Sequence, residues 1–295
     1  MTTLLVSRWL IDYSRRPLNL ALLVVVPVVF VVLSAGALAD FSEILGGAAA
    51  VGEVEAATAG WAAAVLSGVA GFFHVSTSRD ADRRLAAAGV GTATVVVSRL
   101  ISTLALSTLA AIGALAALAA RTDLATTPRV IGATLVFAAI YAGIGAAVGA
   151  IVHSELNGSL IVVFAWIFDV FFGPAMGGVA TVLRLFPLHF PTLVITDIAS
   201  GHSGQLGDLG LSLLWAGLTL SVGTLSLVRT TRPHPTTRRR SPTGQRLGAA
   251  LTAAARQLGR MPVVWILIIA LPVLFISTSI VDEFDRGGVG GGDDD

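Results

Sequence analysis

A long run of uncharged, apolar residues near the start limits most strongly what this chain can fold into. Residues 18–39 contain no charged side chain. A helix needs about 20 apolar residues to cross the hydrocarbon core of a bilayer. The rest of the chain agrees, since 55% of its residues are hydrophobic and only 13% are charged, about half the charged share of a soluble domain. The sequence therefore predicts an all-α, polytopic membrane protein and disfavours a soluble helical bundle.

Seven segments have the length and composition of membrane spans: residues 18–39, 57–75, 92–120, 130–152, 158–180, 209–228 and 263–280. The fifth is interrupted by Gly173 and Pro174. The apolar stretch 181–204 contains Pro187 and Pro191, and we expect it to form two short re-entrant helices covered by protein or water. Residues 1–228 are thus predicted to form a six-span bundle, to which a seventh span is added.

A short amphipathic segment, residues 6–16, precedes the first span. Its apolar residues recur at helical spacing on one face: Val6, Trp9, Leu10 and Tyr13. Its charged residues take the opposite face: Arg8, Asp12 and Arg15. We expect this helix to lie in the membrane interface with its aromatic rings at headgroup depth. The alternative is a charged flank ahead of the span.

The same plan returns further along the chain. Six residues recur at one constant offset: Arg15, Pro17, Pro27, Val28, Phe30 and Ser34 match Arg260, Pro262, Pro272, Val273, Phe275 and Ser279. Residues 249–281 are therefore predicted to be a second interfacial helix plus the seventh span, a partial repeat of residues 8–36. A basic linker, 229–248, precedes this repeat, and residues 282–295 form an acidic, glycine-rich tail of the composition typical of flexible chains.

The placement of charge predicts the topology. All 19 basic residues are Arg, and arginines near span ends stay on the cytoplasmic side. With the N-terminus inside, fifteen of the 19 Arg lie in the cytoplasm and thirteen of the 18 acids lie outside. We therefore expect a cytoplasmic N-terminus.

Several kinds of chemistry are absent from the sequence. The chain has no Cys, which excludes disulfides and thiolate metal sites. Its five His show no ligand spacing, so we expect no metal site and no catalytic residue. No GxxxxGK[ST] loop is present to hold nucleotide phosphates, and no nucleic-acid partner is expected.

The layout resembles the permease subunits of type-2 ABC exporters over residues 5–228. Residues 82–90 (DRRLAAAGV) and 97–100 (VSRL) are similar to that family's cytoplasmic loop and the start of its third span. His153, Ser154 and Glu155 before the fifth span also look like their family counterparts. The seventh span departs from this pattern, which ends near Val228.

The resemblance implies a prokaryotic plasma-membrane permease that forms a homodimer or a heterodimer and binds a cytoplasmic ABC ATPase subunit. That partner would use ATP and Mg, and this chain would bind no cofactor itself. The resemblance assigns ATPase coupling to the charged residues of the first helix and of the loop 79–91: Arg8, Arg15, Arg16, Asp80, Asp82, Arg83 and Arg84. Alternatively, the loop is merely solvated and the helix anchors to anionic membrane lipid.

Three further candidates lie in or beside the spans. Asp169 is the only acid deep inside a predicted span, and a charge there marks a transport pathway or a paired structural carboxylate. Glu155 and His153 could gate the cytoplasmic mouth or form a solvated turn. Gly145 and Gly149 form a GxxxG motif that favours close helix packing.

These observations predict ATP-driven export of a hydrophobic or amphipathic substrate. A structural or regulatory membrane subunit without a pathway of its own is the alternative. An intramembrane hydrolase is disfavoured because the chain lacks an HExxH motif and a second intramembrane Asp.

Overall fold

The computed structural model describes residues 2–15, 17–47, 49–123, 127–177, 181–196 and 205–232, and this part of the chain is built of helices without any strand. The predicted all-α class is therefore confirmed. Arg16, the partial repeat 249–281, the tail 282–295 and the linker beyond residue 232 lie outside the described residues.

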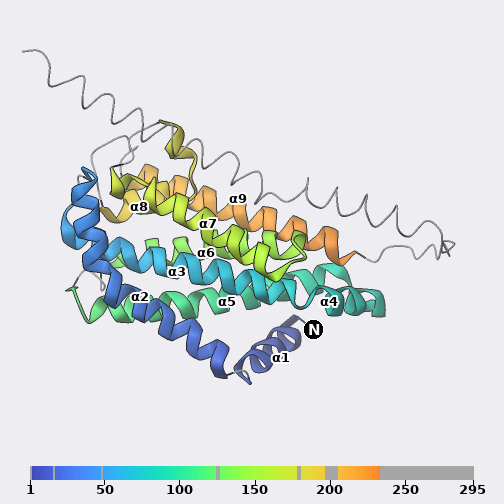
Figure 1. Ribbon diagram of the computed structural model, residues 1–295. Coiled ribbons are helices and arrows are strands. Elements are labelled where there is room, and N and C mark those ends of the chain that lie inside the picture. The colour runs from blue at the N-terminus through green and yellow to red at the C-terminus, as the bar shows by residue number, and fades with distance from the viewer. Residues whose placement is uncertain are drawn as a thin grey trace, which may run out of the picture. The chain divides into compact units, whose positions relative to one another are not determined.

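The described helices follow one another in a simple order: α1 (Thr2–Ser14), α2 (Pro17–Ile44), α3 (Val51–Ser76), α4 (Arg79–Leu85), α5 (Thr92–Ala119), α6 (Pro128–Ile151), α7 (Glu155–Phe171), α8 (His189–Thr196) and α9 (Gln205–Thr231). Short single-turn elements join some of them: η1 (Ala86–Val90), η3 (Pro174–Met176) and η4 (Thr181–Leu185). The long helices run side by side, with α4 at one end of the bundle and α8 at the other (Figure 1). These are called the α4 end and the α8 end below.

Five helices of the described chain are long and apolar enough to cross a membrane: α2, α3, α5, α6 and α9. They correspond to five of the predicted spans. The fifth predicted span, residues 158–180, differs because α7 ends at Phe171. The 17 residues of α7 extend only about 25 Å, which is less than the thickness of the bilayer core. The predicted seventh span lies beyond the described residues.

The end of α7 has a local cause. Gly173 adopts an extended backbone, and Pro174 begins the separate turn η3, because proline cannot continue the hydrogen-bond ladder of a helix. The segment that follows forms η4 and α8, so two short helices do occupy part of residues 181–204. All eight residues of α8 are buried, and protein therefore covers this broken backbone. Its re-entrant position in a membrane stays a prediction.

Small residues let the central helices approach closely. A Cβ atom placed on Gly145 of α6 would lie 2.1 Å from the Gly68 backbone oxygen of α3, and one on Gly149 would lie 2.7 Å from the Phe72 oxygen. In lipid, such close van der Waals packing is a main source of helix association. Tyr141 packs beside this contact, 3.0 Å from a Cβ atom placed on Gly68, with 0% of its surface exposed.

Four acidic residues between the first two predicted spans belong to helices. Asp40 and Glu43 lie in the last turns of α2, and Glu53 and Glu55 lie in the first turns of α3. Arg121 donates to Glu55 at 3.0 Å and to the Val32 carbonyl oxygen at 3.1 Å. This arginine ties α2, α3 and the end of α5 together at the α8 end.

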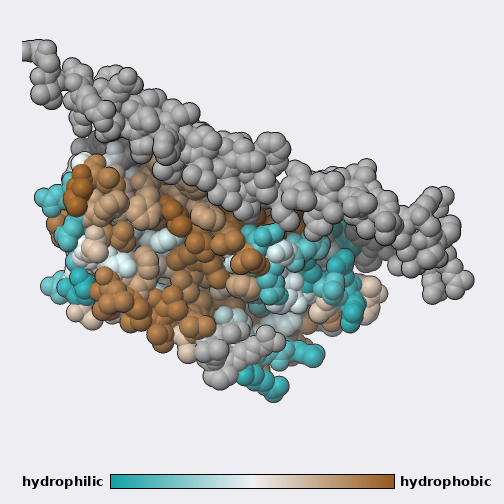
Figure 2. Space-filling view, viewed as in Figure 1, coloured by the Kyte–Doolittle hydropathy of each residue, from teal (hydrophilic) through white to brown (hydrophobic). Residues whose placement is uncertain are grey.

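The molecular surface has the pattern expected of a membrane protein. A broad hydrophobic band crosses the middle of the bundle, and hydrophilic side chains gather toward both ends (Figure 2). Large apolar side chains on α2 and α9 contribute to the exposed surface, such as Leu33 at 73% and Leu214 at 61%. A soluble protein rarely exposes so much contiguous apolar surface.

Candidate functional site

The amphipathic first helix packs against the bundle with the face that the sequence predicts. Val6, Trp9, Leu10 and Tyr13 are half-buried. The predicted polar face is exposed: Arg8, Asp12 and Arg15. Leu10 and Tyr13 contact a small cluster formed by Leu23 of α2 with Leu106 and Ala110 of α5. The helix thus rests against the bundle and presents its charges outward.

A short helix, α4, projects from the same end of the bundle. It is set off from α5 by Gly89 and Gly91, whose φ values of 93° and 84° are in the region that favours glycine. Arg79 at its start donates to the backbone oxygen of Val152 at the end of α6. These features fix the direction in which α4 points.

An ion pair joins α4 to α5 inside the protein. Arg99 donates to Asp82 through two bonds, Nη2 to Oδ1 at 2.5 Å and Nε to Oδ2 at 3.1 Å. The two side chains are only 4% and 3% exposed. Such a two-bond pair fixes the orientation as well as the distance of its partners.

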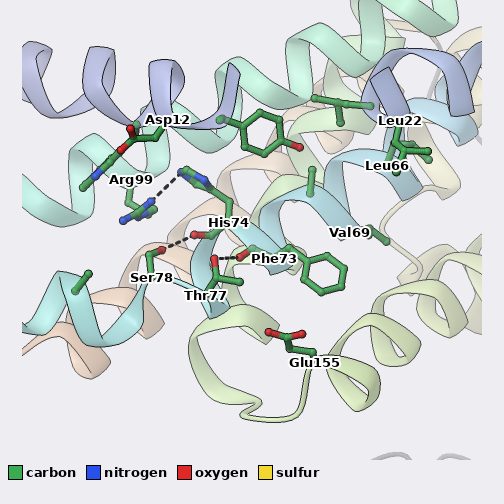
Figure 3. A pocket seen from close by; sticks show the side chains of 15 residues that line it. Asp12, Leu22, Leu66, Val69, Phe73, His74, Thr77, Ser78, Arg99 and Glu155 are labelled. Atoms are coloured by element: carbon green, nitrogen blue, oxygen red, sulfur yellow. Dashed lines mark hydrogen bonds between the residues drawn. The ribbon is translucent and has the colours of Figure 1, made fainter. Parts of the chain in front are cut away.

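Arg99 also contacts two further helices. Its Nη1 lies 3.1 Å from Nε2 of His74 on α3, and its guanidinium carbon lies 3.7 Å from the ring centroid of Trp9 on α1, a cation–π distance. Figure 3 shows Arg99 and His74 meeting below α1. One buried arginine therefore connects α1, α3, α4 and α5, and we call Trp9, His74, Asp82 and Arg99 the arginine cluster.

Burial dominates the electrostatics of this cluster. It raises the pKa of Asp82 above its ordinary value, while the hydrogen bonds and charge of Arg99 oppose the increase. His74 must be unprotonated at Nε2, because a guanidinium can only donate hydrogen bonds. Asp82 and Arg99 therefore balance each other, and the cluster carries no net charge.

The predicted coupling residues separate into two groups. Arg8, Arg15, Asp80, Arg83 and Arg84 are exposed at the α4 end. Arg83 and Asp80 form an exposed pair at 2.5 Å, with their side chains 46% and 78% exposed. Asp82 was assigned to coupling with them, but it is 2% exposed and cannot form part of the exposed surface. Its side chain points inward and bonds to Arg99.

A half-open cavity of about 720 Å³ lies beside the arginine cluster. Its walls come from α1, α2, α3, α4, α5 and the first residue of α7. Glu155, a predicted gate residue, lines this cavity. His153 is exposed in the turn before α7 and is not part of the lining.

Asp169 has a partner within the bundle. The Tyr141 hydroxyl of α6 donates to Asp169 Oδ2 at 2.5 Å, and Asp169 is 3% exposed. Its Oδ1 has no hydrogen bond among the described residues. Asp169 and Glu155 lie at different depths along α7, and only Glu155 lines the cavity.

Sequence reasoning did not assign roles to Arg99, His74 or Tyr141. Arg99 carried a usable signal, because an arginine inside an apolar span needs a partner, and Asp82 precedes it in the adjacent loop. Tyr141 is the only Tyr within a predicted span. His74 gave no signal, because its role depends on the approach of α1 and α5.

The spanning helices, the apolar band and the charged end define a polytopic α-helical membrane protein. Residues 61–227 match the model of a family described as ABC-2 family transporter protein, which is more than half of the 295 residues. The chain belongs to this family and is thus the membrane-spanning permease component of an ABC transporter. Comparison with curated proteins and with solved structures gave no match.

Proposed function

We propose that this permease exports a hydrophobic or amphipathic substrate and is driven by a separate ABC ATPase that docks at the α4 end. The arginine cluster is the observation that supports this proposal best. It ties the exposed helices α1 and α4 to α5, which is long enough to span the membrane. In this proposal the α4 end and the N-terminus face the cytoplasm, where the ATPase and its ATP and Mg are located.

The ATPase would contact the exposed charges of α4 and α1. When two ATPase subunits close on ATP, they would push α4 as a rigid body. Because Asp82 and Arg99 are joined by two buried bonds, α5 would have to follow. The first helix, α1, would move with α5, because the ring of Trp9 packs on the guanidinium of Arg99. A second permease, identical or related, would complete the pathway.

The test is to express this chain with its cognate ATPase and measure complex formation and ATP hydrolysis in membranes. The charge reversal Arg83→Glu with Arg84→Glu should reduce both by tenfold or more, because unlike charges at a docking surface become like charges. Arg184→Glu is the control, since Arg184 is exposed and lies in η4, away from α4. Wild-type complex formation and hydrolysis in the double variant would refute docking at α4.

The same experiment separates transport from a purely structural role. A complex that assembles and hydrolyses ATP, but moves no substrate across sealed vesicles under any condition tested, would indicate a structural or regulatory subunit. Loss of substrate movement together with ATPase coupling in the Arg83→Glu, Arg84→Glu variant would support the permease.

A further inference from the structure

The cavity beside the arginine cluster has an apolar part and a polar part. Leu22 of α2 and Leu66, Val69 and Phe73 of α3 line the apolar part. Figure 3 shows Leu22, Leu66 and Val69 on one side, and Asp12, Arg99, His74 and Ser78 on the other. The cavity volume of about 720 Å³ is in the range of sites that enclose small organic molecules.

Among the described residues that line the cavity, the net charge is negative. Arg99 is the only cation among them, and its charge is balanced by Asp82, to which it is bonded. His74 is neutral in this geometry. Two carboxylates remain, Asp12 on α1 and Glu155 at the start of α7. Both are exposed, and within the described chain neither forms a hydrogen bond or an ion pair.

The hydroxyl groups of the polar part do not alter this balance. Thr77 donates to the backbone oxygen of Phe73 at 2.7 Å, and Ser78 donates to that of His74 at 2.5 Å, so both are engaged within their own turn. The aromatic rings of Tyr13 and Phe73 also line the cavity, and such rings attract cations through their π faces. Carboxylates and aromatic rings therefore favour the same sign of ligand charge.

We propose that this cavity binds an amphipathic organic cation, with its apolar body against Leu22, Leu66, Val69 and Phe73 and its charge facing the carboxylates of Asp12 and Glu155, which line different edges of the cavity. The inference deepens the proposed export function, on which it rests, by naming the class of substrate. An anionic head would face two carboxylates and a cation that Asp82 already neutralises. Arg8 and Arg15 of α1 are exposed and do not line the cavity.

Binding of a lipophilic cation and of an anion of the same shape tests this inference. Tetraphenylphosphonium and tetraphenylborate differ in the sign of their charge and are close in size. Each is titrated onto the full chain in nanodiscs of zwitterionic lipid, and binding to empty nanodiscs is subtracted. The protein should bind the phosphonium saturably, and it should bind the borate at least tenfold more weakly.

Two variants locate the site. Asp12→Asn with Glu155→Gln should weaken phosphonium binding by about tenfold or more, and both residues are exposed, so folding should be retained. Asp40→Asn with Glu43→Gln is the matched control, because it removes two exposed carboxylates from the other end of α2. Leu22→Ala should weaken both ions to a similar degree, since it removes an aliphatic contact that does not depend on charge.

Equal or preferred binding of tetraphenylborate would overturn the inference, and so would equal loss of phosphonium binding in the two carboxylate variants. None of these measurements requires an ATPase. If the chain couples to an ATPase but fails to bind the cation, the substrate class is wrong and the proposed permease function stands. If the cation binds but no ATPase complex forms, the site stands and the proposed energy source fails.

Discussion

Arg99 is the residue on which the arrangement of four helices depends. Arg99→Gln would leave Asp82 buried without its cationic partner, and loss of one member of a buried pair costs about 3–5 kcal/mol. We expect a strongly lowered midpoint of thermal unfolding for the purified protein. Arg83→Gln breaks only an exposed pair, worth about 0–1 kcal/mol, and should unfold like the wild type. Equal midpoints for the two variants would contradict the role assigned to Arg99.

The pH dependence of that variant follows from the direction of the Asp82 pKa. Burial raises this pKa in the folded state, and Arg99 opposes the increase, so Arg99→Gln should raise it further. A carboxyl group whose pKa is higher in the folded than in the unfolded state lowers the free energy of unfolding at high pH. This loss of stability disappears as the pH falls through the pKa of the folded state. The deficit of Arg99→Gln should therefore be smaller at pH 5 than at pH 8. Adding Asp82→Asn should remove this extra pH dependence and restore most of the stability.

At the scale of elements, the contact between α3 and α6 depends on the absence of a single side chain. Gly145→Ala places a Cβ atom where the Gly68 oxygen lies 2.1 Å away, so the two backbones must separate at a cost of about 1–3 kcal/mol. Gly132→Ala is a matched control on α6, because a Cβ there meets nothing within 4 Å. Gly132→Ala should be neutral or stabilising, since alanine lowers the conformational entropy of the unfolded chain.

The experiment compares the unfolding midpoints of both variants in the same micelles. A Gly145→Ala protein as stable as Gly132→Ala would show that the helices do not meet as closely as described. Both variants should also retain ATPase coupling, because a shift between α3 and α6 should not disturb the Asp82–Arg99 bonds directly.

The elements differ in how far the sequence determines them. Long apolar runs are readable because lipid allows few alternatives to a helix, and five predicted spans correspond to described helices. The sequence predicts an interruption at Gly173 and Pro174, but not that α7 ends before them, because these residues can either bend or end a helix. Likewise, Asp82 belongs to a loop rich in exposed charge, and its burial depends on how α4 is rotated against Arg99.

At the scale of the whole molecule, the arginine distribution predicts that the α4 end faces the cytoplasm. The chain contains no Cys, so single cysteines can report on each end without background. Leu45→Cys lies in the turn after α2, and Ala87→Cys lies in η1 beside α4; both positions are exposed. In intact cells an impermeant maleimide should label Leu45→Cys, and it should label Ala87→Cys only after permeabilisation. The reverse pattern would place the predicted docking surface outside the cell, where no ATP-driven partner could reach it, and would overturn the coupling proposal together with the topology.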